Sequence, residues 1–190
     1  MKRILALVFV FMVAFSVVAS AETFPVQDDA GLLTNEQWQN LCDDVTSKIA
    51  KLDNKHEISV VTVDYLSGLS DDEIDKEAQY AFKKQNCGLG DDKSGVLLLV
   101  DASTNSVIVK IYKNGKANQL ITDNKAVSIE RKVCDRIADG DAYGGIDRFV
   151  SESYNCLAEK NGSFAIWIAV GAVVALAVAV GGFIFVKRRK

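Results

Sequence analysis

The sequence predicts an α/β domain in which helices cover a central, mainly parallel β-sheet. The first observation is the aliphatic run 96–100, between Gly95 and Asp101, which is typical of a strand buried on both faces. The second is the β-branched segment 57–64, which ends in Asp64 and also indicates a strand. The third is a helical pattern between these segments, because a strand–helix–strand crossover makes the two strands parallel.

Two capping boxes mark the starts of the first two helices. Thr34 is followed three residues later by Gln37, and Ser70 by Glu73, a spacing that satisfies backbone donors at a helix start. Apolar residues then recur at helical spacing, which predicts two amphipathic helices. The segment 22–34 contains the only proline and an Asp/Gly cluster, so we expect it to be extended and irregular.

The part of the chain after Asp101 completes the sheet and adds two more helices. Residues 106–113 alternate apolar and polar side chains, which indicates a half-exposed strand in a hairpin with the central one. Residues 119–123 indicate a further short strand, which gives a mixed sheet of about four strands. The periodicity of 124–139 and 143–160 predicts two final helices.

Hydrophobic segments near both termini predict export and a membrane anchor. Residues 1–21 carry two basic residues, an apolar run and an Ala-Ser-Ala cleavage site, as a secretory signal peptide does; the alternative is an uncleaved N-terminal anchor. Residues 164–186 carry no charge and match the ~30 Å hydrocarbon core as one transmembrane helix. The basic tail 187–190 follows, which marks a cytoplasmic end. We expect a single-pass protein of the cell membrane, with domain 22–163 outside and the C-terminus in the cytoplasm.

The charge of the domain differs from that of the whole chain. Six of the 22 Lys and Arg residues lie in the leader and the tail, whereas all 25 Asp and Glu residues lie in 22–163, which leaves the domain at −9. Nucleic acids select basic surfaces, so they are excluded as partners. Divalent cations and basic partners suit this charge better.

All four cysteines lie in the predicted exported domain. An even number of cysteines in such a domain predicts two disulfides. Cys134 and Cys156 fall on consecutive antiparallel helices at heights about 15 Å apart, which is too far for a bond. This favours Cys42–Cys156 with Cys87–Cys134, and the alternative is buried free thiols.

Several segments of the chain together resemble the TPM domain family. The matching segments are Val26-x-Asp28-x-Ala30-Gly31-Leu32-Leu33-Thr34, residues 57–63, Gly88-x-Gly90, residues 94–100 and, more loosely, residues 120–123 and 140–145. The resemblance covers residues 24–157. The family includes thylakoid-lumen proteins linked to photosystem II repair, an accessory subunit of a nematode acetylcholine receptor, and many bacterial exported proteins.

The resemblance implies a three-layer α/β/α sandwich in an exported, often membrane-tethered module. It also implies the acid-phosphatase activity proposed for plant members. One departure concerns that activity: many members carry a basic residue just after the central strand, and residues 102–106 contain none.

Aspartates at strand ends are the candidate site residues. Asp64 and Asp101 should emerge at one edge of the sheet, and we expect Asp123 and Asp28, or its neighbour Asp29, to join them there. Carboxylate oxygens are ligands for Ca²⁺ or Mg²⁺, and a bound metal would polarise a phosphoryl oxygen. The alternative is that each acid simply ends its strand and stays solvated.

Two other features suggest chemistry but have ordinary explanations. His56 is the only histidine, and its charged neighbours indicate a solvated side chain. The loop 88–95 has the glycines of a phosphate loop, but it precedes its strand, and its two acids would repel phosphate.

Two functions remain. The first is a membrane-tethered accessory module that assists the assembly or repair of envelope or membrane proteins. The alternative is a weak metal-dependent acid phosphatase. The negative domain, with no arginine near the sheet edge to hold phosphate, favours the first function.

Overall fold

The computed structural model describes residues 24–103 and 106–158 of the 190-residue chain. The predicted leader, transmembrane helix and basic tail lie outside these residues. Within the two described segments, no helix combines the length and hydrophobicity needed to cross a bilayer.

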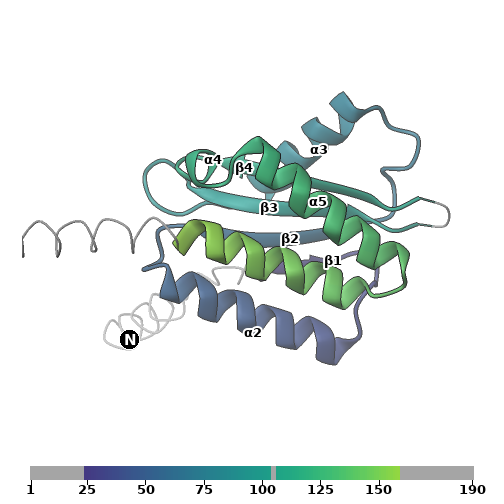
Figure 1. Ribbon diagram of the computed structural model, residues 1–190, viewed down its shortest axis with the longest axis horizontal. Helices are drawn as coiled ribbons and strands as arrows, with labels where there is room; N and C mark the ends of the chain where they lie inside the picture. The colour runs from purple at the N-terminus through teal and green to yellow at the C-terminus, as the bar shows by residue number, and fades with distance from the viewer. Residues whose placement is uncertain (1–23, 104–105, 159–190) are drawn as a thin grey trace, which may run out of the picture.

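Four strands form one sheet at the centre of the domain (Figure 1). They are β1 (Val26–Asp28), β2 (Glu57–Val63), β3 (Gly95–Asp101) and β4 (Ile108–Asn114), in that order across the sheet. The first three strands are parallel, and β4 runs antiparallel to β3. This confirms the predicted mixed, mainly parallel sheet. We call the edge where β1, β2 and β3 end the carboxyl edge, and the opposite one the amino edge.

Two predicted details of the sheet were wrong. The segment before Thr34 is not wholly irregular, because β1 pairs with β2 from Val26 to Asp28. The strand predicted over 119–123 is instead the short helix α4 (Ala117–Leu120). Its apolar neighbour Ile121 is completely buried in the core. The apolar residues of this segment therefore fill the core from a helical turn, and β pairing plays no part.

Helices cover the two faces of the sheet unequally (Figure 1). On one face lie α2 (Asn35–Lys51), α5 (Asp123–Ala138) and the helix over residues 142–158. On the other face, α3 (Asp71–Lys84) is the only helix among the described residues. Both predicted capping boxes are present at the starts of α2 and α3.

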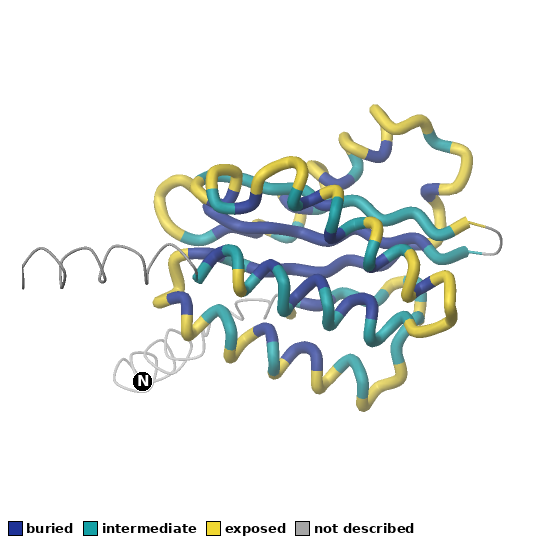
Figure 2. Tube along the Cα trace, viewed as in Figure 1, coloured by how far each residue is buried: buried dark blue, intermediate teal, exposed yellow. Residues whose placement is uncertain are grey.

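Two hydrophobic cores result, one on each face, and the central strands β2 and β3 are the most buried part of the domain (Figure 2). Successive side chains of a strand point to opposite faces. Val60 and Leu98 thus contact the larger core under α2, α5 and residues 142–158, whereas Val61 and Leu99 contact the smaller core under α3. The three-layer α/β/α arrangement follows from this division.

The predicted disulfide between Cys87 and Cys134 was wrong. Cys42, Cys87 and Cys134 are free thiols in the structure. Cys87 lies in the core beneath α3, whereas Cys134 is on α5 across the sheet, so no bond can join them. Burial raises the pKa of Cys87 to about 12. This thiol therefore behaves as a small apolar side chain with low reactivity.

Candidate functional site

Three of the predicted aspartates meet at the carboxyl edge. In the strand register, Asp28 lies beside Thr62 and Asp101 lies beside Val63, the residue that precedes Asp64. The parallel crossover between β2 and β3 therefore places Asp64 and Asp101 at the same edge, as predicted. Hydrogen bonding, however, gives the three carboxylates different roles.

Asp28 fixes the turn that leads into α2. Its Oδ1 accepts the Leu32 N–H at 3.0 Å, and its Oδ2 accepts the Leu33 N–H at 2.9 Å. The Thr62 hydroxyl donates to Oδ1 and in turn accepts the Ala30 N–H at 3.1 Å. The Asp28 carboxylate thus joins β1, β2 and the turn before Thr34.

Asp101 fixes two other loops and is completely buried. Its Oδ2 accepts the Leu66 N–H at 2.6 Å, and its Oδ1 accepts the Ser103 N–H at 2.7 Å. Burial alone would raise the pKa of this carboxyl, but the hydrogen bonds from Ser103 and Leu66 outweigh it and lower the pKa below the usual value. Asp101 is therefore an ionised anchor for the loops that follow β2 and β3.

Asp64 and Asp123 differ from these two anchors. The Asp64 side chain is exposed at the carboxyl edge. Asp123 begins α5 and accepts from Lys113 Nζ at 2.6 Å, which lowers its pKa. Lys113 lies beside Val96, near the start of β3, so Asp123 belongs to the opposite edge of the sheet.

Asp123 lies apart from the other three aspartates predicted to hold a metal. Among residues 24–103 and 106–158, no group of three or more His, Cys, Asp or Glu side chains is arranged to hold an ion. Asp28 and Asp101 already accept two backbone N–H groups each. Metal binding at the carboxyl edge therefore stays a prediction.

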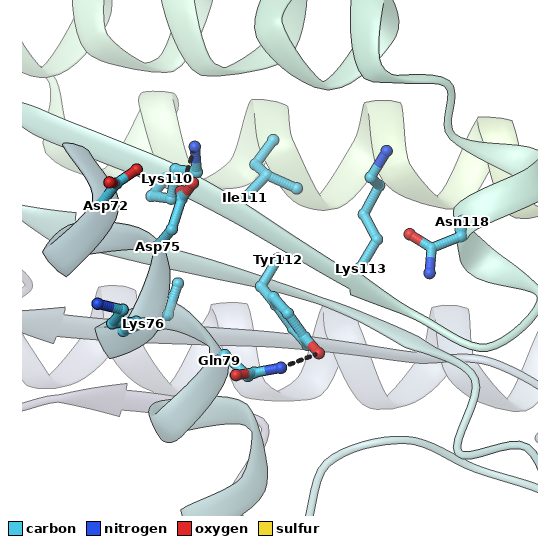
Figure 3. A pocket seen from close by; sticks show the side chains of 10 residues that line it. Asp72, Asp75, Lys76, Gln79, Lys110, Ile111, Tyr112, Lys113 and Asn118 are labelled. Carbon is cyan, nitrogen blue, oxygen red and sulfur yellow. Dashed lines mark hydrogen bonds and ion pairs between the residues drawn. The ribbon is translucent and has the colours of Figure 1, made fainter.

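A groove of about 460 Å³ runs along β4, the last strand across the sheet, which has a neighbouring strand on one side only among the described residues (Figure 3). We call it the α3–β4 groove. Asp75 of α3 forms an ion pair with Lys110 of β4, and Gln79 donates to the Tyr112 hydroxyl at 3.3 Å. Burial works to lower the pKa of Lys110, but Asp75 raises it overall. The rest of the lining is Asp72, Lys76, Ala78, Ile111, Lys113 and Asn118.

A second cavity, of about 550 Å³, lies at the amino edge. We call it the amino-edge cavity; its lining includes Lys55, His56, Asp91, Asp92, Lys116 and Leu157. The prediction that His56 is solvated was wrong, because only 6% of its surface is exposed. Its Nδ1 lies 2.7 Å from the Ser94 hydroxyl, which also accepts the Ala117 N–H at 3.0 Å. Burial lowers the pKa of His56, so its ring is neutral near pH 7.

No pattern in the sequence indicated either cavity. The partner of His56 is 38 residues away along the chain, so no local spacing marks the pair. The α3–β4 groove depends on α3 packing beside an edge strand. The one available signal was the alternation of 106–113, which predicted a half-exposed strand.

Comparison with known proteins identifies the family. The TPM domain matches residues 26–156, which include all four strands. A search of the curated proteins found no match.

Solved structures support the same fold at low sequence identity. The N-terminal domain of a Porphyromonas gingivalis protein has a TM-score of 0.59 at 17% identity, over 74% of this chain and 86% of that one. A protein from the psychrophilic bacterium Bizionia argentinensis has a TM-score of 0.50 at 18% identity, over 67% of this chain and 82% of that one. Because the family match spans more than half of the 190 residues, the chain belongs to the TPM domain family.

Proposed function

We propose that this TPM domain is held outside the cytoplasm by a C-terminal membrane span and binds another envelope or membrane protein, whose assembly or repair it assists. The sequence supports the tether through its leader, its apolar segment 164–186 and the basic tail. The observation that carries the binding role is the α3–β4 groove beside an edge strand.

The C-terminal end of the described domain indicates which edge of the sheet faces the membrane. Leu157, near the C-terminal end of the described residues, lines the amino-edge cavity together with His56. Five residues, 159–163, separate the described domain from the predicted span. At ~3.5 Å per extended residue they reach roughly 20 Å, so the amino edge stays near the bilayer. The carboxyl edge then faces away from the membrane, and the α3–β4 groove opens to the side.

The groove suits an extended segment of a partner protein. Among the described residues, β4 pairs with a strand on one side only. The Ile111 N–H faces away from β3 and donates to Glu130 Oε1 at 2.7 Å. Alternate residues of an antiparallel strand share one orientation, so the backbone of Lys113 faces outward as well. A partner strand would bind this backbone, while side chains of α3 select its sequence.

A photo-crosslinking experiment tests this binding mode in the full chain. We expect p-benzoylphenylalanine at position Gln79, which lines the groove, to crosslink one discrete membrane protein in cells. The matched control is Tyr80, which is also on α3 and 57% exposed but lies outside the groove lining. Glu130→Ala should increase the crosslink, because it frees the Ile111 donor. Equal products from both positions, or none from Gln79, would contradict the proposal.

The second candidate, a metal-dependent acid phosphatase, is favoured by one observation, the shared edge of Asp28, Asp64 and Asp101. Asp64→Asn is the informative variant, since Asp64 is exposed whereas Asp101 holds two loops. We expect phosphate release with millimolar Ca²⁺ or Mg²⁺ to be at background in the full chain and unchanged in Asp64→Asn. Phosphate release by the wild type that is lost in Asp64→Asn, at an unchanged melting temperature, would instead support the phosphatase function. Calcium binding would raise the melting temperature of the wild type.

A further inference from the structure

We propose that the amino-edge cavity binds the phosphoethanolamine headgroup of a phospholipid in the membrane that anchors the chain. In this arrangement Lys116 and His56 hold the phosphate, and Asp91 and Asp92 hold the ammonium group. The proposal rests on the proposed tether for the source of the ligand, but the chemistry of the cavity is independent of it.

The size and lining of the cavity suit a small zwitterion. At about 550 Å³ it is larger than the α3–β4 groove, and its volume falls in the range of small-ligand sites. Two lysines and two aspartates line it, together with the apolar side chains of Leu120 and Leu157. Opposite charges at one opening favour a ligand that carries both signs over a simple anion or cation.

His56 contributes a fixed donor to this cavity. Ser94 is completely buried, and its hydroxyl already accepts the Ala117 N–H at 3.0 Å. If His56 Nδ1 carried the proton, the Ser94 hydroxyl hydrogen would lack an acceptor, at a cost of about 1–3 kcal/mol. Ser94 therefore donates to Nδ1, and the proton of the neutral ring is on Nε2. Among the described residues Nε2 has no hydrogen-bond partner, so its N–H is available to a phosphate oxygen.

The acids of the loop 88–95 supply the opposite charge. The Asp92 carboxylate accepts the backbone N–H of Lys116 at 2.9 Å, which joins this loop to the turn after β4. That turn is tight, since Gly115 has φ +60° and a side chain there would lie 2.6 Å from the Asp92 carbonyl. Asp91 is exposed beside it. Two carboxylates here would repel a free phosphate, but they accept the three N–H donors of a primary ammonium.

The position of the cavity explains why the ligand would be a lipid. Leu157 lines the cavity and lies seven residues before the predicted span. Even a fully extended chain of this length would reach only roughly 20 Å, so the cavity is confined near the headgroup region of the bilayer. A basic side chain close to a membrane surface is attracted to the phosphate of a lipid headgroup.

Lipid competition on the full chain in detergent tests the proposal. We expect native mass spectrometry to show phosphatidylethanolamine retained over phosphatidylcholine and phosphatidylglycerol, because choline lacks N–H donors and glycerol lacks the positive charge. Lys116→Gln and Asp91→Asn should each reduce retention about tenfold, the effect of one lost charge-assisted hydrogen bond. The control Lys51→Gln makes the same charge change on an exposed residue outside the cavity and should leave retention unchanged. Equal retention of all three lipids, or an equal loss in Lys51→Gln, would overturn the proposal.

A soluble headgroup separates the cavity from the tether. His56 is the only histidine, so its ring gives a single set of imidazole NMR signals. Glycerophosphoethanolamine should shift these signals saturably in the wild type but not in Lys116→Gln, and inorganic phosphate should shift them less. If inorganic phosphate shifted the signals as much as glycerophosphoethanolamine does, the proposed contact between the aspartates and the ammonium group would be refuted. A saturable shift in a chain that does not insert into vesicles would refute the tether alone, whereas insertion without a shift would refute the cavity alone.

Discussion

Asp101→Asn is expected to lower the free energy of unfolding by about 2–3 kcal/mol, the cost of leaving a buried donor unsatisfied and losing a charge-assisted bond. The carboxylate is completely buried and accepts from Leu66 at 2.6 Å and from Ser103 at 2.7 Å. An asparagine side chain accepts through one oxygen, and its amide group would oppose the second N–H. Urea denaturation of the full chain in detergent measures the change.

Asp64→Asn is the matched control for this prediction. It makes the same change at the same edge on an exposed side chain, and we expect an effect within about 0.5 kcal/mol. Equal effects of the two substitutions would show that burial and hydrogen bonding of Asp101 do not stabilise the loops.

The Asp101 prediction also has a definite pH dependence. The pKa of the folded carboxyl lies below its value in the unfolded chain, so the unfolded state takes up the proton first. Its contribution to stability is therefore fully present above the unfolded pKa of about 3.9 and is lost as pH falls below it. The difference between wild type and Asp101→Asn should shrink over that acid range. A difference that grows on acidification would contradict the assignment.

Glu152→Gln is expected to lower the free energy of unfolding by about 2 kcal/mol at neutral pH. Glu152, on the helix 142–158, accepts from Lys125 at 2.8 Å and Lys132 at 2.9 Å, both on α5, and from Arg148 at 3.0 Å. Its side chain is only 16% exposed. Burial works to raise the pKa of Glu152, but Lys125 and Lys132 lower it to about 2. This one carboxylate therefore holds two helices together.

Acid titration distinguishes the Glu152 cluster from an ordinary surface charge. Because the folded pKa is depressed, the stabilisation is present above pH 4.5 and is lost as pH falls from 4.5 toward about 2. The melting temperatures of the wild type and Glu152→Gln should therefore converge as pH falls through this range. Asp43→Asn, an exposed acid on α2, is the control and should change little. A Glu152 effect independent of pH would contradict the ion-pair explanation.

The sequence predicted the strands whose signal is local and missed β1, whose conformation depends on its partner strand. The segments of β2 and β3 are long, aliphatic and separated by a capped helix, so composition and spacing suffice. In contrast, β1 has three residues, and its strand conformation depends on pairing with β2. Leu120 and Ile121 resemble a strand in isolation, but the chain after Gly115 makes one helical turn that directs Ile121 into the core.

The candidate site shows the same division. The crossover rule placed Asp64 and Asp101 at one edge, because handedness and parallel pairing follow from the order of elements. Asp123 was placed there only because a strand was expected before it. Sequence also assigned His56 to the solvent from its charged neighbours, whereas its surroundings are set by Ser94 and the turn after β4.

By itself, the sequence determined the α/β class, the two capped helices, the parallel pair of strands and the aspartates at their ends. These features arise from contacts within a few residues and from the fixed handedness of the connection. Only the tertiary structure decided which aspartates hold loops and which is exposed, and that a histidine and a serine form a buried pair. Those outcomes depend on backbone donors and cavities contributed by segments far apart in the chain, which no local pattern records.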